Sequence, residues 1–423
     1  MEKKRSYICI DLKSFYASVE CVERGLDPFS VDLVVADPER SKSTICLAIT
    51  PAMKQKGVKN RCRIHEIPKG MEYIVAKPRM QLYIDYSAKI YGIYLKFVAP
   101  EDVHVYSIDE CFIDVTSYLS LYHVTAKEMA LMMMNAVMQE TGITATAGVG
   151  TNLYLAKIAM DILAKHAENH IGELDEYSFR KRLWDHQPLS DFWQIGSRTQ
   201  RTLNRYGIHT MRDLAKLSLV SEGWLYKTFG IDAELMIDHA WGCESCLMED
   251  IKNYRGKEHS LSSGQVLMRN YSFEEAKVVV KEMTDLLVLD LTRKNLVTDS
   301  VNFFISYDHK CGFGSTGATV HFDIPTNSCN QIIAGIQSAY ESTTNPFLGI
   351  RRIGICANRV HSEEYQQFHF FSDTHRQKKE KNLQKCLISI MDRHGKNAVM
   401  RGCNLLPCST YRLRNNQIGG HNR

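Results

Sequence analysis

The hydrophobic pattern of the chain alternates short apolar runs with longer stretches in which apolar residues recur at helical spacing. The runs at 7–12 and 144–149 predict buried strands. Residues 103–106 and 111–115 are rich in β-branched and aromatic residues, and they predict two strands joined by a bend at 107–110. Helical spacing predicts further elements at 80–97, 125–141 and 153–165. The methionines of the second of these helices are interpreted as core residues.

The middle of the chain predicts a helical segment. From 171 to 244 the pattern is helix, turn, helix, and Gly196 and Gly207 lie in what looks like a helix-hairpin-helix element. Glycine in such a hairpin lets backbone N–H groups approach DNA phosphates without reading sequence. A plain helical hairpin is the alternative. Nearer the N-terminus, Gly148 and Gly150 predict a glycine-rich turn, a pair that does not by itself establish a phosphate site.

The pattern after residue 257 predicts a compact α+β domain. Strands are expected at 264–268, 300–307, 317–322 and 350–360, with helices at 273–291 and 328–340, in the order βαββαβ. The polar stretch before this domain, 245–257, is interpreted as a linker. A charged helix is expected near 376–393.

Composition narrows the class of protein. A chain of 423 residues predicts about two to four domains, and 44% hydrophobic with 24% charged residues is typical of a globular protein. The net charge of +4 permits nucleic-acid binding through local patches but does not require it. Without an apolar run near ~18 residues or a signal-peptide core, we expect a cytoplasmic protein without membrane association.

The thirteen cysteines are odd in number and scattered through apolar segments, which favours reduced thiols in the core. Cys243 and Cys246 have the spacing of zinc ligands, but no second pair of this kind accompanies them. Whether these two residues bind a metal stays open at this point.

Three carboxylates are candidate ligands of a metal ion. Asp109 and Glu110 lie in the expected bend at 107–110, and Asp11 ends the first strand. Neighbouring side chains of a regular strand point to opposite faces, whereas at a tight turn two of them can share one ligand. Hard oxygen ligands of this kind suit Mg²⁺ or Mn²⁺. An ordinary acidic turn in solvent is the alternative.

The stretch 11–20, which begins Asp11-Leu12, together with the acidic bend resembles the catalytic motifs of the Y-family lesion-bypass DNA polymerases. Within that family, the chain resembles the UmuC-type branch, as found in Gram-positive bacteria and their mobile elements. It implies an α+β multidomain protein with right-hand architecture. The implied domains are a palm (1–20 and 78–170), fingers (21–77), a helix-hairpin-helix thumb (171–244), a linker (245–257), a little finger (258–361) and a C-terminal tail (362–423).

The same resemblance implies template-directed, low-fidelity DNA synthesis for lesion bypass by two-metal nucleotidyl transfer. Asp11 and Asp109 would hold two Mg²⁺ ions, with Mn²⁺ as a substitute. Glu110 would help to hold the ion at the primer terminus, and the Leu12 carbonyl would complete the site of the other ion. Ser107 is expected to contact DNA.

Further residues of the resemblance concern the incoming dNTP. Phe15 and Tyr16 match the steric-gate region, in which Tyr16 would leave no room for a 2′-hydroxyl. Lys157 matches a palm lysine that contacts the triphosphate. In the fingers, Pro51 and Lys54 occupy positions where many relatives have tyrosine and arginine, so Lys54 could supply charge but not a bidentate contact.

Partners are the last expectation. Besides primer-template DNA, a sliding clamp is expected to bind a peptide whose anchors would be Gln367, Phe368, Phe370 and Phe371. Phe368 and His369 depart from the usual form of that peptide, and a hydrophobic strap across the little finger is the alternative. A UmuD-like accessory subunit is also considered. Two other functions stay open: a DNA- and clamp-binding relative that is inactive without an accessory subunit, and another two-metal palm enzyme such as a nucleotide cyclase.

Overall fold

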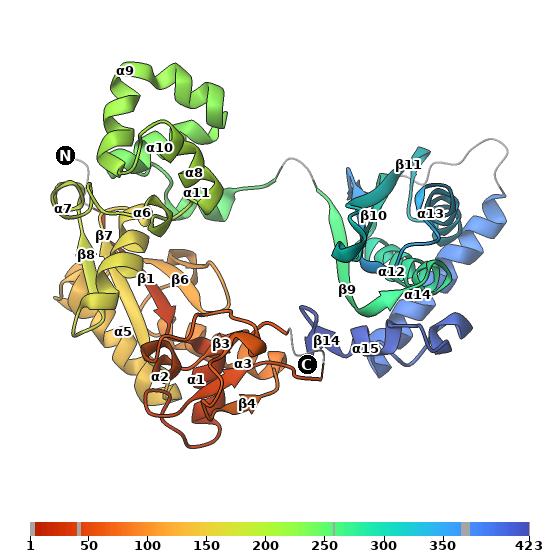
Figure 1. The fold of residues 1–423 in the computed structure, drawn as a ribbon, viewed down its shortest axis with the longest axis horizontal. Helices are drawn as coiled ribbons and strands as arrows, with labels where there is room; N and C mark the ends of the chain where they lie inside the picture. The colour runs from red at the N-terminus through yellow and green to blue at the C-terminus, as the bar shows by residue number, and fades with distance from the viewer. Residues whose placement is uncertain (1–4, 40–43, 257–258, 365–372, 423) are drawn as a thin grey trace. The chain divides into compact units, whose positions relative to one another are not determined.

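The computed structural model describes residues 5–39, 44–256, 259–364 and 373–422, and it divides into two compact units, Met1–Tyr254 and Arg255–Arg423 (Figure 1). None of the helices in these ranges combines the length and the apolar character that a membrane span needs. Each unit has its own sheet and its own buried core, so each is described by itself.

The first unit is built on a sheet of strand order β5-β6-β1-β7-β8. Its strands are β1 (Tyr7–Leu12), β5 (Val103–Val105), β6 (Glu110–Asp114), β7 (Ala145–Gly150) and β8 (Ile171–Leu174). The central strand β1 is antiparallel to both of its neighbours, while β7 and β8 are parallel. The expected strand pair around residues 107–110 is therefore confirmed, with β5 and β6 paired across the bend.

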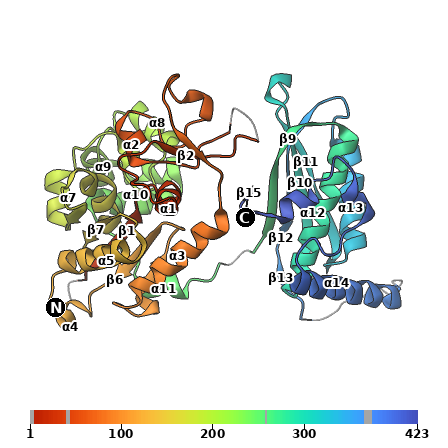
Figure 2. The same ribbon diagram turned by 90° about the horizontal axis from the view of Figure 1, so that it is seen from below.

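Two long helices support this sheet. Helices α3 (Met80–Tyr94) and α5 (Ala126–Thr141) contact each other, and Figure 2 shows them side by side. The methionines Met129, Met133 and Met134 of α5 are buried, which confirms their interpretation as core, whereas Met132 and Met138 are 38% and 50% exposed, so the interpretation is wrong for these two. Short elements complete this region: η2 (Pro100–Asp102) and α4 (Leu119–Tyr122).

The predicted helix at 153–165 is only partly correct. Helix α6 (Leu153–Ile158) is followed by a π-helical turn, Ala159–Leu163, and a 3₁₀ turn, Ala164–His166. The expected glycine-rich turn is also wrong, because Gly148 and Gly150 lie within strand β7. A Cβ on Gly148 would come within 2.0 Å of the Ala156 carbonyl oxygen, so glycine here allows α6 to pack directly on the strand.

The first unit also contains a smaller sheet, of strand order β3-β2-β4, built from residues between 33 and 76. It consists of β2 (Leu33–Val35), β3 (Ala48–Ile49) and β4 (Ile74–Ala76), accompanied by α1 (Phe15–Val22), α2 (Pro51–Gln55) and η1 (Ile64–Glu66). Its compact core includes Val34, Ile49 and Met53.

The rest of the first unit is helical. Its elements are α7 (Glu176–Arg182), η5 (Leu189–Asp191), α8 (Ser197–Arg205), α9 (Met211–Phe229), α10 (Asp232–Trp241) and α11 (Met248–Asn253). Helix α11 lies within the stretch expected to be a linker. It belongs to this unit, because Met248 is buried and the Lys252 ammonium donates to the carbonyls of Pro100 (3.1 Å) and Val103 (2.6 Å).

The second unit has the expected βαββαβ order. Its elements are β9 (Leu261–Tyr271), α12 (Phe273–Arg293), β10 (Leu296–Tyr307), η6 (His309–Cys311), β11 (Ser315–Thr326), α13 (Cys329–Thr343) and β12 (Ile350–Asn358), followed by β13 (His361–Ser362). The sheet order is β11-β10-β12-β9, and α12 and α13 pack on one face of it (Figure 2).

The C-terminal residues form part of this second unit. They comprise α14 (Thr374–His394), η7 (Gly402–Leu405), α15 (Tyr411–Asn415), β14 (Gln417–Ile418) and β15 (His421–Asn422). Glu282 of α12 is 1% exposed and accepts hydrogen bonds from Asn404 (3.2 Å), the Thr410 N–H (3.1 Å) and the Ser409 hydroxyl. Because a buried carboxylate needs such donors, the tail stabilises the core of the unit.

Candidate active site

The acidic residues meet where β1 and β6 pair. Asp11 of β1 is the register partner of Glu110, the first residue of β6. The Leu12 N–H donates to the Asp109 carbonyl (2.9 Å), and the N–H groups of Tyr106 and Ser107 both donate to the Glu110 carbonyl (3.0 Å). These backbone bonds close the bend and bring residues about a hundred positions apart in the sequence to one edge of the sheet.

The neighbouring acids Asp109 and Glu110 take different partners in this structure. The Ser107 hydroxyl donates to Asp109 Oδ1 (2.6 Å), and the Asp109 N–H donates back to that hydroxyl (3.3 Å). Ser107, which the sequence suggested as a DNA contact, therefore orients Asp109. Glu110 instead binds the Lys157 ammonium through Oε1 (2.7 Å) and accepts a hydrogen bond from the Cys9 thiol (3.3 Å).

The chemistry of this acidic set fits a divalent cation. Burial, together with the nearby charges of Asp109 and Glu110, raises the pKa of Asp11 to about 7. Carboxylates that repel one another in this way are stabilised by a cation with a preference for oxygen, such as Mg²⁺. Within the described ranges, no set of three or more His, Cys, Asp or Glu side chains is already arranged to hold a metal ion. Glu110 would have to exchange its lysine partner to join one.

Lys157 is placed by the helix that packs on β7. Asn152 begins α6 with its side chain accepting from the Leu155 N–H (2.8 Å), and one turn further Lys157 points at both Glu110 and Asp161 (3.1 Å). Burial alone would lower the pKa of Lys157, but the charges of Asp161 and Glu110 and the hydrogen bond to Glu110 raise it overall. The ammonium therefore stays protonated and paired. Its expected contact with a triphosphate stays a prediction.

The two aromatic residues expected near the sugar lie at the start of α1. Ser14, with φ of 48°, turns the chain from β1 into this helix. Phe15 is 2% exposed and belongs to the core, whereas Tyr16 is half-buried. The ring of Tyr16 stacks on the ring of Tyr83 with a centroid separation of 4.4 Å and an interplanar angle of 16°. Sequence reasoning did not find Tyr83, which lies on α3.

Cations gather around Lys54, which lies near Asp11. Burial lowers the pKa of Lys54, the charge of Asp11 raises it, and the charge of Lys165 lowers it. Burial and the charge of Lys54 also lower the pKa of Lys13, whose ammonium lies 3.2 Å from the ring nitrogens of His170. Lys54 was expected here, but Lys13 and Lys165 were missed. The position of Lys13, two residues after the catalytic candidate Asp11, was the available signal.

Comparison with known proteins identifies the family. The family model described as impB/mucB/samB matches residues 10–161, and the model of the C-terminal domain of that family matches 258–370. UvrX of Bacillus subtilis (strain 168), a protein named for UV-damage repair, is 30% identical over 99% of this chain and 98% of its own length. DNA polymerase IV 2 of the same organism is 31% identical over 100% of both chains. The chain belongs to the Y family of DNA polymerases. The recognition made from the motifs is thus confirmed.

The fold of the polymerase agrees with this assignment. A solved structure described as a Y-family DNA polymerase chimera of Dbh and Dpo4 has a TM-score of 0.66 with it, at 19% identity, and the match covers 84% of this chain and 99% of that one. The expected α+β fold class and the enzyme class, a DNA-directed DNA polymerase, are confirmed.

Several predicted sites of the polymerase lie away from the carboxylates. Gly196 precedes α8 and Gly207, with φ of 75°, follows it, so the two glycines bracket one helix. Cys243 is exposed and Cys246 is half-buried; in the described ranges neither belongs to a group that could hold a metal. The clamp-binding candidates Gln367, Phe368, Phe370 and Phe371 lie outside the described residues.

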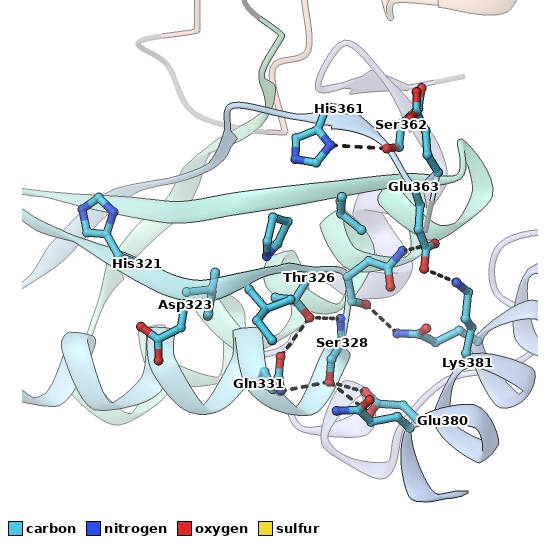
Figure 3. Close-up of a pocket in the computed structure, with 18 of the residues that line it drawn as sticks. His321, Asp323, Thr326, Ser328, Gln331, His361, Ser362, Glu363, Glu380 and Lys381 are labelled. Carbon is cyan, nitrogen blue, oxygen red and sulfur yellow. Dashed lines mark hydrogen bonds and ion pairs between the residues drawn. The ribbon is translucent and has the colours of Figure 1, made fainter. Parts of the chain in front are cut away.

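A groove in the second unit of the polymerase is lined by polar side chains that bind one another (Figure 3). Glu380 of α14 accepts from the Ser328 hydroxyl (3.0 Å) and the Asn330 N–H (2.9 Å) at the start of α13. Lys381 pairs with Glu363. These contacts attach α14 to the domain, so the groove is interpreted as a structural junction.

Proposed function

We propose that this Y-family polymerase performs template-directed, low-fidelity DNA synthesis past damaged template bases, using two divalent cations. The observation that carries the proposal is the pairing of β1 with β6, which places Asp11 beside the bend that holds Asp109. Family membership supports the polymerase reaction. The names of two relatives, one for UV-damage repair and one for DNA polymerase IV, support a role in repair.

In this proposal the acidic set binds the cations. Asp11 and Asp109 would hold both ions, Glu110 would join at the primer terminus, and the Leu12 carbonyl would contribute on the nucleotide side. When bound, Mg²⁺ or Mn²⁺ ions make a hydroxyl more nucleophilic and neutralise charge on a transferred phosphoryl group. The task of Ser107 is to keep Asp109 in its orientation.

The remaining residues would position the dNTP. Tyr16 would lie against the sugar, with Phe15 fixing the start of α1 in the core. Lys54 would bind triphosphate oxygens, and its neighbours Lys13 and Lys165 supply additional positive charge around Lys54. Lys157 would reach the triphosphate only if Glu110 releases it.

DNA and protein partners complete the proposal. Primer-template DNA would be held in part through backbone N–H groups near Gly196, at the start of α8, and near Gly207, in the turn after α8. N–H groups at a helix start bind phosphates, and a glycine turn lets the backbone approach them closely. The segment containing Gln367 and its aromatic neighbours would dock on a sliding clamp. The following experiment tests whether synthesis requires a UmuD-like accessory subunit.

The deciding experiment is primer extension with Mg²⁺ on an undamaged template and on one with an abasic site. Wild type and Asp85→Ala, an exposed change on α3, should extend the primer, whereas Asp109→Ala should not. Fluorescence anisotropy with labelled DNA should show that all three proteins still bind. A wild type that binds DNA but extends neither template would refute independent synthesis and favour a requirement for an accessory subunit.

A further inference from the structure

Glu20 is a carboxylate with a fully buried side chain, one turn after Tyr16 on α1. It accepts two hydrogen bonds from Arg79, from Nε to Oε1 (3.0 Å) and from Nη2 to Oε2 (2.9 Å). Arg24 donates to it as well, and the Tyr83 hydroxyl donates to Oε1 (2.8 Å). Burial raises the pKa of Glu20, but the hydrogen bonds from Arg79, Arg24 and Tyr83 lower it overall, so the carboxylate stays charged.

These contacts fix both the hydroxyl group and the ring face of Tyr83. Tyr83 is 0% exposed, its hydroxyl is bound to Glu20, and its face lies against Tyr16 at 4.4 Å. Residues four apart lie on the same face of a helix. Tyr16 and Glu20 therefore face α3 together, and Arg79 and Tyr83 face α1 together, which makes the two helices contact through one continuous set of side chains.

We propose that Glu20, Arg79 and Tyr83 are positioning residues that hold the ring of Tyr16 in one orientation and thereby set the sugar selectivity of the polymerase. This inference rests on the proposed role of Tyr16 beside the incoming sugar. A ring that excludes a 2′-hydroxyl by steric contact works only if it cannot turn aside. The parallel stack with an anchored Tyr83 removes that freedom, because rotation of Tyr16 would break the aromatic contact.

The magnitude follows from the strength of such a stack. Loss of one aromatic pair changes a rate ratio by roughly 2- to 10-fold. Tyr83→Leu should therefore lower the ratio of kcat/KM for a dNTP to that for the matching rNTP by roughly 2- to 10-fold, mainly through faster rNTP incorporation. Tyr83→Phe and Glu20→Gln, which keep the ring but weaken its anchor, should give a smaller change in the same direction.

The chain offers a matched control. Tyr86 lies three residues after Tyr83 on α3, and its hydroxyl donates to Glu23 (2.7 Å), the residue that caps the C-terminus of α1. Tyr86→Phe removes the same kind of bond between the same helices at a site away from Tyr16. Its sugar ratio should equal that of the wild type.

A double variant tests the route of the effect. In a Tyr16→Ala background, Tyr83→Leu should produce no further change in the sugar ratio, because there is no ring left to position. If Tyr83→Leu and Tyr83→Phe slow dNTP and rNTP incorporation equally, with the ratio unchanged, Tyr83 is merely structural and the inference is overturned. An equal change from Tyr86→Phe would overturn it as well.

Equilibrium binding separates this inference from the proposed function. Binding of dCTP and CTP, which differ only in the 2′-hydroxyl, is measured with a dideoxy-terminated primer and Ca²⁺, so that no synthesis is needed. If the wild type fails to extend primers but prefers dCTP, and Tyr83→Leu reduces that preference, the proposed polymerase activity fails while the positioning role stands. If the wild type binds both nucleotides equally, the positioning role is refuted.

Discussion

Replacing Lys157 by methionine tests whether its ammonium is an ion-pair partner in the unliganded protein. The side chains of Lys157 and Glu110 are 9% and 10% exposed, and the pair distance is 2.7 Å. Methionine keeps the length and apolar stem of lysine but leaves Glu110 buried without a cation. Breaking a buried pair from one side costs about 3–5 kcal/mol. Because Asp161 is 28% exposed and can be hydrated, we expect a value near the lower end, about 3 kcal/mol.

The assay is thermal unfolding of the full chain in buffer with EDTA. The first unit spans Met1–Tyr254, and for a unit of this size each kcal/mol lowers Tm by about 2–4 °C. Lys157→Met should therefore lower the Tm of the transition of that unit by about 6–12 °C. Lys165→Met, an exposed change eight residues further on, is the control and should alter the free energy of unfolding by less than about 0.5 kcal/mol.

The deficit of Lys157→Met should depend on pH. Burial raises the pKa of Glu110 even with Lys157 present, and removing the ammonium raises it further. In the variant, folded Glu110 takes up a proton at a higher pH than unfolded Glu110, so lowering the pH favours the folded state. The difference in free energy from the wild type should therefore shrink between pH 8 and pH 5. A loss below about 1 kcal/mol that does not vary with pH would refute the ion pair, and the triphosphate would then be the main partner of Lys157.

Two further substitutions test contacts inside each unit, the first in the second unit and the other in the first unit. Ser409→Ala removes a donor to buried Glu282 and should lower the free energy of unfolding of the second unit, measured in urea, by about 1.5–3 kcal/mol. The control Ser342→Ala, at an exposed position, should leave this free energy unchanged. Equal free energies of unfolding for the two variants would show that the tail is not attached through Glu282. Gly148→Ala should destabilise the first unit by about 3 kcal/mol, because its Cβ would meet the backbone of α6. In contrast, Gly92→Ala, in open space in the last turn of α3, should stabilise it by about 0.5–1 kcal/mol. Equal unfolding temperatures for the two glycine variants would refute the close packing of α6 on β7.

The sequence predicted the elements whose pattern is local. The βαββαβ order of the second unit and the strand pair around residues 107–110 follow from hydrophobic periodicity over a few residues, and both are present. The approach of Asp11 to the acidic bend came from the family motifs. Helix α11 was missed because its polar residues resemble a linker; buried Met248 and the two hydrogen bonds of Lys252 attach it to the first unit. The break in the helix after Ile158 has no sequence signal that we can identify.

What the sequence could not provide is the choice of partner for each buried charge. Apart from Arg24, four residues on, Glu20 binds residues 59 and 63 positions away, and Glu282 binds residues more than 120 positions away, so no local pattern connects them to these distant partners. Their need for partners was nevertheless visible. Glu20 stands between Val19 and Cys21, and Glu282 shares helical spacing with Val279, so both break an apolar pattern at positions that must be buried. Since an unpaired charge there would prevent folding, each such break predicts a distant set of donors. In this polymerase one of these breaks lies a single helical turn from the residue proposed to select the sugar.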